Sequence, residues 1–152
     1  MSNSFQTELY KAAALTFEEL GFMFPSPELA DMYKDAAVEA RVSVGFTGPY
    51  SGVLVITVRG DLLMAIATNM LGEDVPPSAQ QQRDALGEIA NVVCGNVLPR
   101  VSGTKEVFRI AAPKVGDLPE SLNGVDTPSA QVSMALDEGM ADIELYVLPQ
   151  AA

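Results

Sequence analysis

The chain lacks histidine altogether and contains a single cysteine, Cys94. Without histidine it cannot form a Ser/His/Asp or Cys/His nucleophile, nor a histidine-ligated metal site. One cysteine allows neither an internal disulfide nor a cysteine-based zinc site. If the chain is an enzyme, its own chemistry therefore rests on carboxylates and amides, and Cys94 is interpreted as a half-buried, small apolar residue.

Basic residues and long apolar runs are also scarce. Lys and Arg number 9 against 20 Asp and Glu, giving a formal net charge of -11. Because phosphate binding needs clustered Lys and Arg, this balance argues against nucleic acid and an anionic membrane surface as partners. The longest apolar runs fall far short of the roughly 20 residues that span a bilayer. With no export signal recognisable at the N-terminus, we expect a cytoplasmic protein without a transmembrane helix.

Hydrophobic residues make up 48% of the 152 residues, which is enough to bury a core and predicts a single domain over residues 1–152. Apolar spacing predicts helices and strands in a definite order. The predicted helices cover Ser4 to about Met23, 62–71 and about 78–98, and the predicted strands cover 38–46, 53–58, 106–111, 132–136 and 143–147. A helix followed by a strand pair occurs twice, which indicates an internal duplication. We therefore predict an α+β fold, a largely antiparallel sheet with helices packed on one side.

Several residues are predicted to begin or end these helices. Asp61 is expected to cap the helix over 62–71. Ser78 and Gln81 have the spacing of a capping box at the start of the long helix, and Pro99 is expected to end it. The connection over 116–129 is interpreted as a surface loop.

The long helix carries an unusual polar face. At about 100° per residue, Asp84, Glu88, Asn91 and Gly95 fall within an arc of roughly 60°, and the opposite side is apolar. Gly87 and Gly95 each cost the helix about 1 kcal/mol relative to Ala. The face is either a plain solvated surface or a functional one. The glycines either let a partner approach the helix backbone or permit close packing inside the protein.

The pattern Asp84-x3-Glu88-x2-Asn91, followed by Pro113, resembles the signature of the CheC/CheX/FliY family of chemotaxis phosphatases. A single copy of the motif in a chain of this length is most similar to CheX. There are 21 residues between Asn91 and Pro113, one fewer than the family spacing, so Pro113 is either part of the signature or a strand terminator. In the first helix, Phe22 stands where a second motif after Glu19 would need Asn, so no second site is expected.

The resemblance implies a role for each matching residue. Members of the family dephosphorylate the response regulator CheY, whose phosphoaspartate lies beside a Mg²⁺ ion held by the regulator. Glu88 is expected to form a salt bridge with a lysine of the regulator, and Asn91 to orient the attacking water. Asp84 is given a supporting role, and Gly87 and Gly95 are expected to let the loops of the regulator approach. No metal or cofactor of the chain's own is expected.

Two other functions stay open at this point. The chain could be a non-catalytic CheX-like module that binds a receiver domain, or a dimeric adaptor in which the Glu88 face is merely solvated. The family also implies a homodimer formed through sheet edges, which protects exposed edge strands from unwanted pairing.

Overall fold

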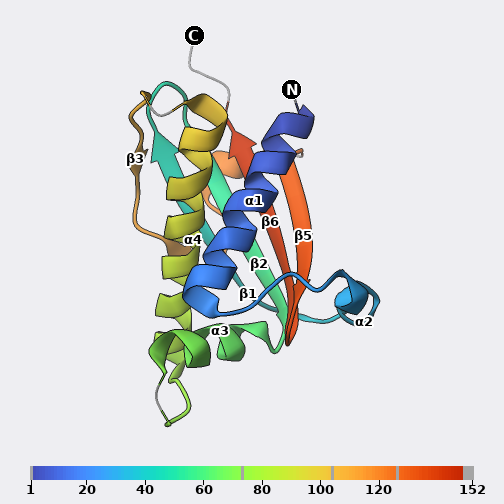
Figure 1. Cartoon of the computed structure of the whole chain (residues 1–152). Helices are drawn as coiled ribbons and strands as arrows, with labels where there is room; N and C mark the ends of the chain where they lie inside the picture. Colours follow the sequence, from blue (N-terminus) through green and yellow to red (C-terminus); the bar gives the residue numbers. More distant parts are fainter. Residues whose placement is uncertain (1, 73, 104, 126, 149–152) are drawn as a thin grey trace.

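A computed structural model shows an antiparallel sheet with helices on one face (Figure 1), and it describes residues 2–72, 74–103, 105–125 and 127–148. In chain order its elements are α1 (Ser2–Gly21), η1 (Pro27–Leu29), α2 (Ala30–Tyr33), β1 (Val38–Thr47), β2 (Gly52–Gly60), α3 (Leu62–Leu71), α4 (Ala79–Ser102), β3 (Arg109–Ile110), β4 (Lys114–Val115), η2 (Glu120–Leu122), β5 (Ala130–Leu136) and β6 (Gly139–Val147). The predicted α+β class is confirmed.

The sheet is built from two hairpins that meet at their second strands. Its strand order is β3-β1-β2-β6-β5, with β4 also pairing with β1, and every pairing is antiparallel. The central pair runs in register from Gly52 opposite Val147 to Gly60 opposite Gly139. Strand β2 is buried on both faces over 52–58, as its continuous apolar run and its central place in the sheet require. Each hairpin follows a long helix in the sequence, α1 or α4.

The main hydrophobic core lies between the helices and the sheet. Figure 1 shows α1 and α4 running side by side across one face, with α3 at one end. Phe17 of α1, Leu54 of β2 and Leu86 of α4 meet in this core, and all three are fully buried. None of the helices in the described ranges is both long and apolar enough to cross a membrane.

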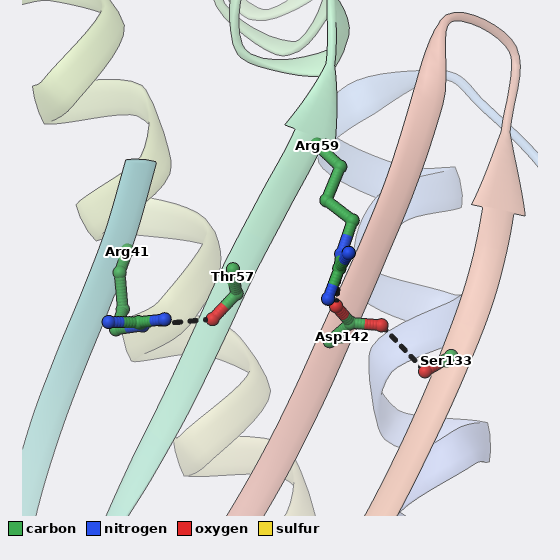
Figure 2. Close-up of polar contacts among 5 residues, drawn as sticks. All are labelled: Arg41, Thr57, Arg59, Ser133 and Asp142. Carbon is green, nitrogen blue, oxygen red and sulfur yellow. Dashed lines mark hydrogen bonds and ion pairs between the residues drawn. The ribbon is translucent and has the colours of Figure 1, made fainter. Parts of the chain in front are cut away.

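The other face of the sheet is polar over part of its area. Figure 2 shows Arg59 of β2 paired with Asp142 of β6 at 2.7 Å, and Ser133 of β5 donating to the same carboxylate at 2.7 Å. On the neighbouring strands, Arg41 donates to the hydroxyl of Thr57 at 3.2 Å. These contacts join all four long strands and satisfy polar groups that β-sheet formation brings together.

The remainder of that face is covered by the segment that follows β4. Leu122 of η2 packs against Val53, Val55 and Tyr146, forming a second, smaller cluster of buried residues. The prediction of a plain surface loop over 116–129 is therefore wrong at Leu122. An isolated leucine in a polar segment has no period, so the sequence pattern could not reveal that it is buried.

Helix α1 ends slightly earlier than the predicted boundary near Met23. Phe22 has a φ of 53°, in the left-handed region. Its N–H donates to the carbonyl of Glu18, and the N–H of Met23 donates to that of Phe17, both at 3.2 Å. The first of these bonds, from a residue in the left-handed conformation to the carbonyl four residues before it, is the bond of the αL motif that closes helix C-termini. The helix therefore ends one residue before a phenylalanine in a conformation that usually favours glycine.

Helix α3 begins as predicted, but Asp61 does not cap it with its side chain. The N–H of Leu63 donates instead to the carboxylate of Glu39, from β1, at 3.0 Å. A carboxylate from another element thus satisfies a donor that the helix itself leaves free. Sequence spacing cannot predict this cap, because the two residues lie in different elements.

Helix α4 does not end at Pro99, which lies inside it. Proline removes only its own N–H bond to the preceding turn, and the helix continues to Ser102. The last turn closes where the N–H of Gly103 donates to the carbonyl of Pro99 at 2.9 Å. Gly103 itself has a φ of 91°, which the missing side chain of glycine makes accessible.

Candidate functional site

The start of α4 is fixed by the predicted capping box. The hydroxyl of Ser78 accepts from the N–H of Gln81 at 3.1 Å, and the amide oxygen of Gln81 accepts from the N–H of Ser78 at 2.8 Å. The predicted apolar side of the helix is fully buried against the core, at Leu86, Ile89, Val93 and Val97. Burial of that side turns the face with Asp84 and Glu88 outward, as the helical geometry predicts.

The outward face of α4 forms one side of a hollow of about 330 Å³. The residues that line this hollow are Gln80, Arg83, Asp84, Gly87, Glu88, Asn91, Pro113 and Val115. The structure therefore brings together five of the six predicted site residues, Pro113 among them, and leaves Gly95 outside. Sequence reasoning missed Gln80 and Arg83, although each lies one helical turn before a predicted residue. It also missed Val115, for which no local signal exists.

Asn91 and Glu88 present different chemistry to the hollow. Glu88 is exposed to solvent, whereas Asn91 is half-buried. The side-chain oxygen of Asn91 is buried and has no hydrogen-bond partner among the described residues. Leaving a buried carbonyl oxygen unpaired costs about 1–3 kcal/mol. The amide of Asn91 is therefore not committed through its oxygen to a structural hydrogen bond with the described residues, although the residue lines the hollow.

Asp84 belongs to a short polar chain along the first turns of α4. The amide of Gln80 donates to the carboxylate of Asp84 at 2.7 Å, and the guanidinium of Arg83 donates to the amide oxygen of Gln80 at 3.0 Å. These contacts restrain the carboxylate on the helix surface. Asp84 thus lies beside Glu88 at the edge of the hollow, with its carboxylate bonded to Gln80.

The carboxylates of Asp84 and Glu88 also border a second, more apolar groove on the other flank of α4. Met70 and Leu71, at the end of α3, line this groove together with Ala85. Leu71 keeps 40% of its surface exposed. The two carboxylates therefore form a ridge between the polar hollow and an apolar groove.

The wall opposite α4 comes from the segment after the helix. The predicted strand over 106–111 is reduced to β3, which pairs Arg109 with Thr47 and Ile110 with Phe46 of β1. Its first part is wrong, since Val107 is 79% exposed. Pro113 follows and packs directly on Gly87, so this glycine is covered by the chain itself rather than open to a partner.

Gly95 lies near the same segment but beyond the hollow. It is half-buried, and a side-chain carbon added there would meet only the end of Ile110, at the ordinary contact distance of 3.8 Å. The two helical glycines thus have different surroundings. Only Gly87 is in a position where packing demands the absence of a side chain.

Cys94 takes no part in the hollow. It is fully buried in the core, so the prediction of a half-buried residue is corrected to a more enclosed one. Burial raises the pKa of its thiol to about 12, because the thiolate would lose its hydration. In the described part of the chain, no group of three or more Asp, Glu or Cys side chains could hold a metal ion.

Comparison with known proteins identifies relatives of the whole fold. A family model described as "Chemotaxis phosphatase CheX" matches residues 41–136, a range that includes the hollow and most of the sheet. A search of curated proteins found no match.

Solved structures of chemotaxis proteins resemble the chain over nearly its full length. The chemotaxis protein CheX from Vibrio vulnificus is 20% identical, with 97% of this chain and 98% of that chain covered and a TM-score of 0.67. CheX from Desulfovibrio desulfuricans is 19% identical, with coverages of 94% and 98% and a TM-score of 0.65. A CheX–CheY–BeF3–Mg²⁺ complex from Borrelia burgdorferi is 12% identical, with coverages of 94% and 97% and a TM-score of 0.58. At these identities the likeness establishes the fold.

Proposed function

The chain belongs to the CheX family of chemotaxis phosphatases, and from this premise we propose that it hydrolyses the aspartyl phosphate of a CheY-like response regulator. The family description supports the reaction class, and the CheX of Borrelia burgdorferi that forms a complex with CheY supports the partner. The observation that carries the proposal is the side chain of Asn91, an amide whose buried oxygen has no partner among the described residues and which lines an open hollow beside the exposed carboxylate of Glu88.

The chemistry asks little of the enzyme beyond positioning. An aspartyl phosphate is a reactive acyl phosphate, so the catalyst must mainly place a water in line with the phosphorus. The water oxygen bonds to phosphorus as the bond to the aspartyl oxygen breaks. The aspartate leaves as a carboxylate, and inorganic phosphate and a proton are released.

An amide suits the water-positioning role. The oxygen of Asn91 can accept from the water while its NH2 group donates, and the group stays neutral beside the phosphoryl oxygens. A carboxylate there would bring negative charge towards the phosphoryl group. A glutamine does the same work in GTPases, where it orients the attacking water.

Glu88 is proposed to hold the regulator in register. It lies one turn before Asn91 on the same face and is exposed, so a cation of the partner can reach it. Asp84 supports this edge of the hollow through its contact with Gln80. We assign no cofactor to the chain itself, and the Mg²⁺ that neutralises the phosphoryl group belongs to the regulator. We also propose a cytoplasmic location for the reaction, on the basis of the chemotaxis family to which the chain belongs.

The two roles can be separated by measuring phosphate loss from the phosphorylated regulator at increasing concentrations of the chain. Asn91→Ala should lower the saturating rate constant on the order of 100-fold, as removal of one preorganised group does in other active sites. Glu88→Ala should chiefly raise the half-saturating concentration, by about 10-fold or more, because a charge-assisted hydrogen bond is lost. Asn96→Ala is the matched control, since Asn96 lies on α4 outside the hollow.

Each alternative function has its own result in this experiment. A regulator that binds the chain while keeping its normal phosphate lifetime would identify a non-catalytic binding module. Wild-type rates in both Glu88→Ala and Asn91→Ala would overturn the assignment of the hollow. A solution interface that buries Glu88 between two copies of the chain would favour the adaptor.

We also propose that the chain forms a homodimer through the free edge of β5. The carbonyl of Ala135 points away from β6, because it accepts from the N–H of Ser26 at 2.7 Å. By the alternation of antiparallel strands, the backbone groups of Gln131 and Ser133 point the same way. Neither has a backbone partner on that side among the described residues. A second copy of β5 could pair with them.

A further inference from the structure

Pro113 approaches α4 closely at Gly87. A carbon placed at the Cβ position of Gly87 would lie 2.9 Å from Cγ and 3.4 Å from Cβ of Pro113. The first distance is shorter than real side-chain carbons adopt, so any other residue at position 87 would displace the proline. The proline ring thus occupies the space that a side chain would need.

Pro113 lies in a strap, defined here as residues 109–115, that runs along the outer side of β1. The strap is held at both ends. Ile110 pairs with Phe46, and Val115 pairs with Val42. Backbone contacts with β1 hold the strap on both sides of Pro113, since the N–H of Ala111 donates to the carbonyl of Gly45 at 2.8 Å and Lys114 pairs with Ser43. Pro113 has no N–H to donate, and its ring packs on α4 at Gly87, which adds a contact between the strap and the helix.

The strap also bounds the environment of Asn91. Asn91 lies one helical turn after Gly87, and it lines the same hollow as Pro113 and Val115. Its amide oxygen is excluded from solvent. Displacing Pro113 outward would enlarge the hollow next to this amide and admit further water. A water with several competing neighbours is poorly oriented for attack.

We propose that Gly87 is a positioning residue for phosphate hydrolysis. Its missing side chain seats Pro113, and the seated proline fixes the wall that confines the amide of Asn91. This inference rests on the proposed phosphatase function and adds to it a reason for a glycine at a helix position where alanine is intrinsically preferred.

The test measures phosphate loss from the phosphorylated regulator with Gly87→Ala. The saturating rate constant should fall on the order of 10-fold, because small misplacements of a positioning group are costly. The half-saturating concentration should change by less than about 2-fold, since Glu88 remains exposed for docking. A merely structural glycine would change the amount of folded protein and leave the rate constant per folded molecule unaltered.

Pro113→Ala supplies the matched rescue. It removes the Cγ atom at 2.9 Å, so the Gly87→Ala/Pro113→Ala double variant has room for the added methyl group. The double variant should be faster than Gly87→Ala alone, a non-additive result that indicates a direct contact. A wild-type rate in Gly87→Ala, or a double variant no faster than the single one, would overturn the proposal. If Gly87→Ala does not fold, Pro113→Ala alone should still lower the saturating rate constant. An unchanged rate constant would count against the proposed role of the Gly87–Pro113 contact.

A second readout needs no regulator. In NMR spectra of the chain alone, Gly87→Ala should shift the side-chain NH2 signals of Asn91 and the backbone signals of 111–115, and in the Gly87→Ala/Pro113→Ala double variant the Asn91 signals should lie closer to their wild-type positions. Unshifted signals would contradict the claim that the packing of Pro113 on Gly87 fixes the surroundings of Asn91. The wild-type chain could fail to accelerate phosphate loss while these signals still shift in the single variant and return in the double variant. In that case the proposed function is wrong, and the contact between Gly87 and Pro113 is still supported.

Discussion

The amide oxygen of Asn91 is buried without a partner, and this has a consequence for stability as well as for function. An unpaired buried carbonyl costs about 1–3 kcal/mol, which packing elsewhere in the protein must offset. Groups retained at such a cost are typical of functional sites, where activity and stability compete. In this respect Asn91 differs from Asn96 on the same helix, which donates to the hydroxyl of Thr16 at 3.4 Å.

We therefore predict that Asn91→Ala leaves the free energy of unfolding unchanged or raises it by up to about 1 kcal/mol, since the unpaired oxygen disappears. Asn96→Ala should lower it by about 1 kcal/mol, because the Asn96–Thr16 hydrogen bond is lost. Urea denaturation of both variants measures the difference. A loss of 1 kcal/mol or more in Asn91→Ala would show that its oxygen has a stabilising partner in solution.

At the level of single residues, the sequence predicted which side chains share a helix face better than it predicted what surrounds them. Helical geometry placed Asp84, Glu88 and Asn91 on one face, and the structure has them lining one hollow. The role of Gly87 was not predictable, because the residue that covers it, Pro113, lies in another element. Spacing alone also left open whether Pro113 belonged to the site.

Among the elements, α3 shows how a helix can start on a carboxylate from outside its own sequence. Glu39 of β1 accepts from the N–H of Leu63, while Asp61 at the N-cap makes no such bond. Both carboxylates lie near the positive end of the helix dipole. The two carboxylates differ because only Glu39 accepts a hydrogen bond from the N–H of Leu63.

Glu39→Ala should accordingly destabilise the protein by about 0.5–1 kcal/mol more than Asp61→Ala does. Each variant removes one exposed carboxylate near the same helix end, so Asp61→Ala serves as the matched control. Thermal or urea unfolding of the two variants measures the difference. Equal losses of stability, or a larger loss in Asp61→Ala, would indicate that Asp61 caps the helix, as the sequence pattern favours.

Elements with a clear hydrophobic period were predicted well, and those without one were not. The stripe over 62–71 matches α3, and the two hairpins match the alternating segments. Strands β3 and β4 have two residues each, too few to show a period, and their pairing with β1 is a tertiary contact. Pattern reasoning therefore found only the start of the strap over 109–115, within the strand predicted over 106–111, and missed β4, although the strap forms one wall of the hollow.

For the whole molecule, the free edge of β5 predicts the oligomeric state. Light scattering should give twice 16.1 kDa, about 32 kDa. Gln131→Pro removes an outward N–H without touching the bonds to β6, so it should shift the mass towards 16.1 kDa. Gln131→Thr keeps the N–H and should remain a dimer. A wild-type mass of about 16 kDa would contradict pairing through this edge.

The overall architecture also explains why the proposed site is on α4. The apolar side of this helix is anchored in the core between α1 and the sheet, and its capping box fixes where it begins. The strap then closes one side of the outward face. A rigid helix with one bounded face is a suitable support for a group that must orient a water.

The measurement that tests this account most directly is the rate of phosphate loss from a phosphorylated CheY-like regulator, with saturating wild-type chain or saturating Asn91→Ala. We predict that the wild-type chain accelerates the loss and that Asn91→Ala, folded and still bound to the regulator, is slower on the order of 100-fold. Equal rates for the two proteins would contradict the claim that Asn91 orients the attacking water.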